Sequence, residues 1–387
     1  MEIIENTVLK GKKVFNVAVI GAGPIGGYSA YLLAKAGHKV SIYENHGVVG
    51  CPIQCTGLLT SDFDQFNFPM DSFLVNTFNK VEVFSPHGKL EIKQKEYLVS
   101  RTKFDEFFVD MAVKAGAKLF LNHTFIGRES NTGSDITGGV VGNTIVIKDS
   151  VKAIEKRIKP DIVIAADGPL SHTAKAYDFY HPEREHYFGV QALVQGNFEV
   201  NTYQTHFGEN ICPDLFAWIV PESSTTARVG LAMRKNSKVY FDKFLKEHNF
   251  KPLEIQAGSI PIYHPQQQLY KDNCYLVGDA AGFVKATTLG GLIPGLKQAE
   301  ILADCVINNK DYERESRKLA RKLKLHLSVR KILDKFKDKD WDTLVSYMNQ
   351  PRIQKVLEKH TRENPLPLIT KILLKEPRFL MFGKYLF

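Results

Sequence analysis

The stretch VFNVAVIGAGPIG, residues 14–26, decides the fold. Its first seven residues form a nearly continuous apolar run, which is typical of a strand buried on both faces of a sheet. Residues 24–37 then have the pattern of a helix. Between strand and helix, Gly21 permits a tight turn, Gly23 lets a pyrophosphate approach the backbone, and Gly26 lets the helix pack on the strand. The stretch therefore predicts a dinucleotide bound at a helix N-terminus.

A carboxylate follows at the spacing that such a site needs. Residues 40–44, VSIYE, predict a second strand that ends in Glu44, 23 residues after Gly21. An acid here accepts hydrogen bonds from ribose hydroxyls, which favours NAD or FAD over NADP. The sequence VGDAAG at residues 277–282 suggests that one extended dinucleotide is held at both of its ends. FAD is the dinucleotide that fits this arrangement best.

Length and hydropathy set the class of protein. With 387 residues and 44% hydrophobic residues, the chain can bury a large core in two or three structural units. It has no run of about 18 apolar residues, and its first residues lack the apolar segment of a signal peptide. We therefore expect a cytoplasmic protein, or one on the cytosolic face of a membrane.

The positive charge is concentrated at one end of the chain. Residues 309–387 contain 20 Lys and Arg and 10 Asp and Glu, a balance of +10, whereas residues 1–308 contain 31 and 32, a balance of −1. Such a tail indicates an anionic partner or, alternatively, a solvated helical face. No nucleic-acid-binding motif accompanies it, so we expect no nucleic-acid partner.

The cysteines predict neither a disulfide framework nor a metal centre. Their number is five, and an odd number argues against a framework of paired cysteines. Cys51 and Cys55 form a C-x3-C in a loop bounded by glycine and proline. No second Cys/His pair stands at zinc-like spacing, so no metal site is predicted.

The strand and helix patterns predict a discontinuous α/β architecture. Strand-like segments at 187–231 interrupt the nucleotide-binding pattern, and residues 131–142 have the composition of a hairpin tip. We expect an FAD-binding domain at 1–60, 98–178 and 260–309, a β-rich substrate domain at 61–97 and 179–259, and a basic helical region at 310–387.

These motifs together resemble a known group of proteins. GAGPIG, Glu44, Arg101 with Asp105, ADG at 166–168 and GDAAG at 278–282 are similar to the FAD-containing flavoproteins of the p-hydroxybenzoate hydroxylase fold. Within that group the chain resembles the geranylgeranyl reductases, including the archaeal digeranylgeranylglycerophospholipid reductases. The resemblance implies a Rossmann-like FAD-binding domain with an inserted antiparallel β substrate domain and a C-terminal helical region.

The most discriminating segment is CPDLFAWIVP, residues 212–221. Geranylgeranyl reductases have a P-x-x-Y-x-W-x-F-P-like stretch that lines the lipid pocket, and Pro213, Trp218 and Pro221 match it. Phe216 replaces the tyrosine, which removes a possible proton donor. The resemblance implies that Pro213, Phe216, Trp218 and Pro221 line the substrate pocket.

By position, the resemblance also implies the contacts to FAD. The glycine loop and the backbone at Ile25 would contact the pyrophosphate. Glu44 would bind the adenosine ribose, and Arg101 would lie near the pyrophosphate or ribityl chain. Asp279 would bind the ribityl hydroxyls, and Cys55 and Thr56 would lie beside the flavin. The backbone N–H groups of Gly291 and Leu292 would face the pyrimidine ring of the flavin.

The implied reaction saturates C=C bonds of geranylgeranyl chains on archaeal-type ether phospholipids, with hydride from FADH2 N5. Cys55 is the candidate proton donor by position, and His206 is a second one. Moving a C20 chain from a bilayer into water costs about 16 kcal/mol, so we expect a peripheral membrane protein. The basic and apolar tail suits such an interface, or else it packs as a helical cap on the substrate domain.

Other functions use the same motifs. An aromatic-ring monooxygenase shares the fold and FAD, and a membrane-associated flavin-binding protein would bind FAD without reducing lipid. A halogenase is disfavoured, because halogenases have a W-x-W-x-I-P signature and this chain has Phe216 in place of the first Trp. The electron donor is open between ferredoxin and NAD(P)H, because a second GxGxxG is missing but this fold can use NAD(P)H without one.

Overall fold

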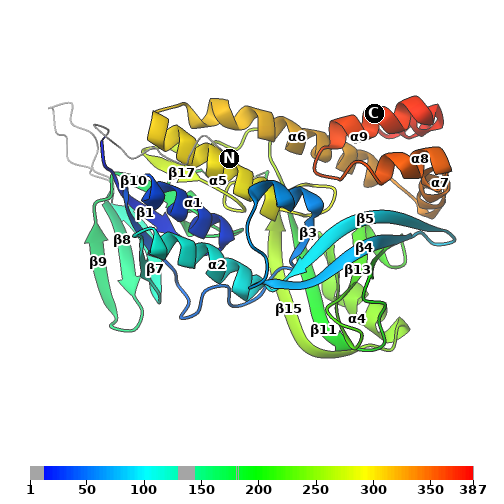
Figure 1. The fold of residues 1–387 in the computed structure, drawn as a ribbon, viewed down its shortest axis with the longest axis horizontal. Coiled ribbons are helices and arrows are strands. Elements are labelled where there is room, and N and C mark those ends of the chain that lie inside the picture. Colours follow the sequence, from blue (N-terminus) through cyan, green and yellow to red (C-terminus); the bar gives the residue numbers. More distant parts are fainter. Residues whose placement is uncertain (1–12, 130–143, 180, 182, 387) are drawn as a thin grey trace.

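The structure is a computed structural model that describes residues 13–129, 144–179, 181 and 183–386. The predicted hairpin tip at 131–142 lies outside the described residues. Figure 1 shows a nucleotide-binding half and a second β-sheet side by side, with the C-terminal helices running along one side of both.

The first half is built on a six-stranded sheet of order β16–β17–β10–β1–β2–β6, parallel except for β16. Its strands are β1 (Asn16–Ile20), β2 (Lys39–Tyr43), β6 (Lys118–Phe120), β10 (Ile162–Ala165), β16 (Tyr270–Lys271) and β17 (Cys274–Leu276). Successive β1 residues from Val17 to Ile20 are all buried. Because neighbouring side chains of a strand point to opposite faces, both faces of β1 are covered, as the apolar run predicts.

Helices and a small sheet share the core of this half. The helices are α1 (Pro24–Lys35), α2 (Arg101–Lys114), α3 (His172–Ala176) and α5 (Leu292–Asn308). The small antiparallel sheet contains β7 (His123–Glu129), β8 (Thr144–Asp149) and β9 (Ile154–Ile158). Helix α2 begins at Arg101, because the Ser100 carbonyl accepts the first helical hydrogen bond, from the Phe104 N–H at 2.8 Å. Arg101 therefore stands on the first turn of a helix.

The second sheet has eight strands in the order β15–β11–β14–β13–β12–β4–β5–β3. They are β3 (Leu58–Thr60), β4 (Leu74–Phe84), β5 (Lys89–Val99), β11 (His186–Gln195), β12 (Thr202–Gly208), β13 (Cys212–Pro221), β14 (Thr226–Met233) and β15 (Lys251–Pro261). All neighbours are antiparallel except β4 and β12, which pair in parallel across more than 100 residues of sequence. The 3-10 helix η1 (Ser61–Phe66) follows β3, and α4 (Ser237–Glu247) packs on β11 and β14.

The C-terminal region is a helical cap. It contains α6 (Tyr312–Leu333), α7 (Asp338–Met348), α8 (Pro351–Leu357), α9 (Pro365–Lys375) and the 3-10 segment η2 (Pro377–Leu386). Leu319 and Leu323 of α6 are buried in the nucleotide-binding core, while Trp341 and Ile372 join a separate core with Leu90 of β5. The apolar residues at helical spacing in α6 thus hold the cap onto the body. No helix in the described part of the chain is long and apolar enough to cross a membrane.

Candidate functional site

Of the three glycines in the loop after β1, only Gly23 has open space beside it. A side chain at Gly21, where φ is +102°, would bring its Cβ within 2.4 Å of the Ala166 carbonyl oxygen. At Gly26 the Cβ would stand 2.2 Å from the Gly21 oxygen, which explains the close packing of α1 on the loop. At Gly23 nothing lies within 4 Å of such a Cβ, and Gly23 lines the main cavity. The backbone at Gly23 is therefore open to a ligand.

The N-terminus of α1 is prepared for an anion. Gly23 is the N-cap residue, no side chain caps the helix, and its first turn carries no acidic residue. The first N–H groups and the positive end of the helix dipole therefore face the cavity. This is the electrostatic environment in which helices bind phosphate groups.

Glu44 is fixed beside this loop. It follows β2 directly, and its carboxylate accepts the Ala22 N–H at 2.8 Å and the His46 N–H at 3.0 Å. The side chain is largely buried, and the residue lines the cavity. A carboxylate held in this way is positioned to accept hydrogen bonds from the hydroxyls of a sugar.

Asp279 and Gly291 meet at the other end of the nucleotide-binding part of the cavity. A Cβ on Gly291 would lie 2.8 Å from Asp279 Oδ1, so only glycine fits there beside this carboxylate. Helix α5 begins at the next residue, Leu292, and no side chain caps it. Burial raises the pKa of Asp279, and the guanidinium groups of Arg101 and Arg184 partly offset this.

Arg101 forms a bidentate ion pair with Asp105, with Nε–Oδ1 at 3.1 Å and Nη2–Oδ2 at 3.0 Å. Burial alone would lower the pKa of Arg101, but Asp105 and the neighbouring Cys55 raise it above its ordinary value. The Arg101 guanidinium therefore keeps its positive charge beside the Cys55 sulfur.

The loop that carries the two cysteines connects the two halves of the site. Cys55 Sγ accepts the Gly57 N–H at 3.4 Å, and Cys51 Sγ lies 3.7 Å from Thr102 Oγ1. Both thiols are free. Thr56 Oγ1 donates to Gln191 Oε1 of β11 at 2.7 Å, so the loop is tied to the second sheet.

One cavity of about 880 Å³ joins these residues to the cap. Beyond the cysteine loop its walls become apolar and come from three directions: Val81, Val83, Leu90 and Ile92 of β4 and β5; Phe216, Trp218 and Val220 of β13; and Trp341, Leu344, Met348, Leu368, Ile369 and Ile372 of α7 and α9. We call this part the apolar arm. Phe216, Trp218 and Val220 alternate along β13, so they share one face of the strand.

The structure brings most of the predicted site residues to this cavity. Gly21, Gly23, Ile25, Glu44, Cys55, Thr56, Arg101, Asp279, Gly291, Leu292, Phe216 and Trp218 line it. Gly26 instead packs against Gly21, while Pro213 is exposed and Pro221 is buried outside the lining. His206 is not among the lining residues: it stacks on Phe84 at a centroid distance of 4.7 Å. The role of His206 as a second proton donor is therefore not supported by its position.

A buried charged cluster at the cavity wall is absent from the sequence predictions. Lys285, six residues before Gly291, forms an ion pair with Glu363 of the cap, and both side chains are about 5% exposed or less. His326 of α6 lies nearby and hydrogen-bonds Thr287 Oγ1 at 2.7 Å. Lysine at 285 is an unusual charge in an apolar stretch, but its partner lies 78 residues away, so sequence spacing gives no sign of the pair.

Comparisons with known proteins agree with this geometry. Residues 19–79 match the NAD(P)-binding Rossmann-like domain. The chain is 30% identical to a digeranylgeranylglycerophospholipid reductase of Methanocaldococcus jannaschii, over 96% of this chain and 98% of that protein. It is 27% identical to digeranylgeranylglycerophospholipid reductase 2 of Methanopyrus kandleri, over 96% and 99% of the two chains.

Solved structures share the fold. A geranylgeranyl bacteriochlorophyll reductase-like protein of Thermoplasma acidophilum superposes with a TM-score of 0.79 at 21% identity, covering 97% of this chain and all of that one. The flavin-dependent halogenase CmlS superposes with a TM-score of 0.67 at 15% identity, covering 95% of this chain and 78% of the halogenase. At these identities the likeness extends to the fold alone.

Proposed function

The chain belongs to the family of digeranylgeranylglycerophospholipid reductases, and we propose that it saturates C=C bonds of geranylgeranyl chains on archaeal-type ether phospholipids, with FAD as its cofactor. One observation carries this proposal. The cavity begins at a dinucleotide-binding glycine loop and continues, past Cys55, as the apolar arm under the cap. A cofactor end joined to an apolar arm suits a redox reaction on a long hydrocarbon chain.

The residues at the cofactor end fit FAD. The open backbone at Gly23 and the uncapped α1 suit a pyrophosphate, and Glu44 suits the adenosine ribose. Asp279 would bind the ribityl hydroxyls, with Arg101 near the pyrophosphate or ribityl chain. The N–H groups at Gly291 and Leu292 would meet the pyrimidine ring of the flavin, where the N-terminus of α5 favours negative charge. In this proposal the FAD-binding domain is discontinuous and comprises residues 1–60, 98–178 and 260–309. The substrate domain comprises residues 61–97 and 179–259, and the basic helical region comprises residues 310–387.

The reduced flavin, when bound, supplies the hydride that such a reaction needs. The protein's own contribution is to position the alkene and to hold a proton. An isolated alkene is a poor electrophile, so the walls of the apolar arm must orient it closely and exclude water. Cys55 Sγ, beside the Arg101 guanidinium, is the group that we propose to hold the proton delivered to the chain.

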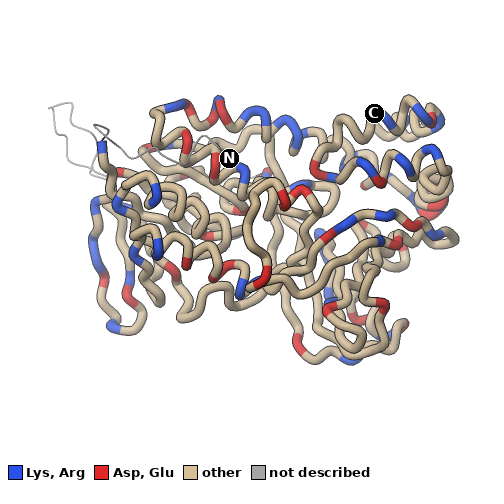
Figure 2. Tube along the Cα trace, in the orientation of Figure 1, with Lys and Arg blue, Asp and Glu red and all other residues tan. Residues whose placement is uncertain are grey.

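We also propose that the cap docks on a membrane. Helix α9 and η2 carry five apolar side chains that are all at least 43% exposed: Leu366, Leu374, Leu380, Met381 and Leu386. Exposed cations of α6 add positive charge: Arg314, Arg317, Lys318, Arg321 and Lys324. Figure 2 shows blue segments recurring along α6 and the terminal helices. Apolar and basic surface together is what an anionic lipid interface attracts.

The route of the substrate follows from the two faces of α9. Leu368, Ile369 and Ile372 line the apolar arm, whereas Leu366 and Leu374 are exposed. A lipid chain that enters beside α9 would pass from the bilayer to the cavity without crossing water. The electron donor in this scheme is ferredoxin or NAD(P)H.

The experiment is a single turnover without oxygen. The flavin-loaded protein is reduced with dithionite, digeranylgeranyl glycerophospholipid is added, and the lipid is analysed by mass spectrometry. Stepwise gains of about 2 Da, the mass of two hydrogens per saturated bond, are expected. An unchanged lipid mass with reduced flavin in the protein would exclude lipid reduction and favour a monooxygenase, which oxygen and NAD(P)H assays would then reveal.

A further inference from the structure

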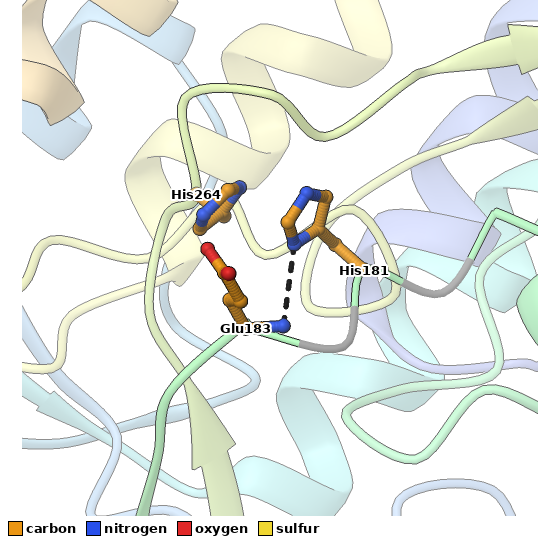
Figure 3. A group of neighbouring side chains, drawn as sticks. All are labelled: His181, Glu183 and His264. Atoms are coloured by element: carbon orange, nitrogen blue, oxygen red, sulfur yellow. Dashed lines mark hydrogen bonds between the residues drawn. The ribbon is translucent and has the colours of Figure 1, made fainter.

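Two histidines and a glutamate meet away from the cavity, where the chain passes between the two large sheets. One ligand atom from each of His181, Glu183 and His264 lies within 4.8 Å of the other two. The imidazole rings stack with centroids 3.8 Å apart. In Figure 3 the Glu183 carboxylate points toward the His264 ring, while the Glu183 backbone N–H donates to His181 Nδ1 at 3.3 Å.

The two chain segments that carry these residues are held together on both sides of the cluster. One segment leads from α3 to β11, and the other leads from β15 back to β16. The Ile262 N–H donates to the Glu185 carbonyl at 3.0 Å, and Gln267 Nε2 donates to the Phe179 carbonyl at 2.6 Å. His181 and Glu183 lie between Phe179 and Glu185, and His264 lies between Ile262 and Gln267. The two backbone segments that carry the donors are thus held together before any ligand arrives, which lowers the entropy cost of binding.

The donor set selects the class of ligand. Two imidazoles and one carboxylate suit zinc, which takes three protein ligands and a water at sites with an open position. Magnesium and calcium prefer oxygen ligands alone.

The side chains must rearrange to bind zinc. Zinc bonds of about 2.1 Å in a tetrahedron place ligand atoms about 3.4 Å apart. Here the ligand atoms lie within 4.8 Å of one another, and Nδ1 of each histidine accepts a backbone N–H at 3.3 Å, from Glu183 at His181 and from Gln266 at His264. Glu183 is exposed and both histidines are half-buried, which leaves their side chains room to move. The neighbouring cation Arg184 donates from Nη1 to the Ala280 carbonyl at 2.9 Å.

We propose that His181, Glu183 and His264 form a zinc site that clips together these two connections between the nucleotide-binding half and the second sheet. The sequence predicts no metal site, because more than 80 residues separate His181 from His264. The Arg184–Ala280 bond links the same segment to the GDAAG motif. The site would therefore stabilise the junction on which the cofactor end of the cavity depends.

The test measures zinc binding by the flavin-loaded protein after treatment with EDTA. Isothermal titration with ZnCl2 should give one tight site per chain and a higher melting temperature. His264→Ala should weaken binding at this site at least about 10-fold and abolish the thermal shift. His87→Ala is the matched control, because this exposed histidine pairs with Asp342 at a different place on the protein.

Two results would overturn the proposal. One is the absence of a stoichiometric zinc site in the wild type. The other is unchanged zinc affinity in a correctly folded His264→Ala protein, which would assign the zinc to other ligands such as the free thiols. If His264→Ala does not retain flavin, Glu183→Gln decides, since its exposed side chain is replaced without disturbing the fold; equal affinity in that variant would contradict the site.

Discussion

At the scale of single residues, Cys55 and Cys51 form a natural pair for comparison. Both line the cavity, but only Cys55 lies beside Arg101. We predict that Cys55→Ala lowers turnover about 100-fold, the usual effect of losing a proton donor, while flavin content stays the same. Cys51→Ala, which loses only its contact with Thr102, should keep most of the activity. Full turnover by Cys55→Ala would remove Cys55 from this role.

His326 predicts how stability depends on pH. Burial, and secondarily the Lys285 cation, lower its pKa to about 3, whereas an unfolded histidine titrates near pH 6.5. Between these values the unfolded chain binds more protons than the folded one, so stability falls as the pH drops below about 6.5. From pH 7 to pH 5 this histidine should cost about 2 kcal/mol.

Urea unfolding at pH 7 and pH 5 checks this prediction. His326→Gln keeps a hydrogen-bonding group for Thr287 but cannot titrate, so its loss of stability should be smaller by about 2 kcal/mol. His206, whose pKa burial lowers to about 4, acts in the same direction in both proteins and cancels in the comparison. Equal pH dependence of the two proteins would mean that His326 has the same pKa in the folded protein as in the unfolded chain.

Residues whose placement depends on local sequence could be predicted. Gly21, Gly23 and Glu44 stand at the spacing set by one strand–helix–strand unit, and the structure brings them together at one end of the cavity. Lys285 and Glu363 could not be paired in this way, because their contact depends on how the cap folds back over the body. Charge pairs between distant segments leave no periodic signal in a single sequence.

At the scale of elements, α9 and η2 carry the proposed membrane contact. We predict that Leu374→Glu with Leu380→Glu weakens binding to anionic liposomes, because each removes exposed apolar surface and adds negative charge. Co-sedimentation measures the effect. Leu253→Glu on β15 is the matched control, since Leu253 is also about half exposed but lies on the second sheet. Equal binding by the double variant and the control would place the membrane contact elsewhere.

The helices of the tail were predictable as helices, but their packing was not. Leu319 and Leu323 recur at helical spacing, which suits a membrane face and a buried face equally. In the structure they are buried in the nucleotide-binding core, and the exposed leucines belong to α9 and η2 instead. Similarly, the strand patterns of β4 and β12 gave no hint that they pair in parallel, since that register depends on the whole sheet.

At the scale of the whole molecule, the Lys285–Glu363 pair joins the cap to the segment before α5. Burial favours a neutral Glu363, but Lys285 more than offsets this and lowers its pKa. We predict that Glu363→Gln destabilises the protein by about 3 kcal/mol or more, because Lys285 is left buried without a counter-charge. Adding Lys285→Met should recover part of that loss. The exposed pair Lys238–Asp242 is the control, and breaking it should cost under about 1 kcal/mol.

Denaturant unfolding followed by flavin fluorescence and by circular dichroism measures both effects. If Glu363→Gln costs no more than the loss of the exposed pair, the buried pair does not hold the cap in place. The fold class could be inferred from the order of motifs, since the glycine loop and the GDAAG motif stand on either side of the strand-like segments of the second sheet. The cavity that extends from the glycine loop to the cap could not, because its walls come from segments more than 250 residues apart.

The central claim is that the lipid chain reaches the flavin and accepts its electrons. The most direct measurement adds digeranylgeranyl glycerophospholipid in detergent micelles to the dithionite-reduced, flavin-loaded protein without oxygen and follows the absorbance of oxidised flavin. The account predicts that the lipid reoxidises the flavin, with one flavin reoxidised per double bond saturated. A flavin that stays reduced with the lipid, yet is reoxidised as soon as oxygen enters, would contradict it.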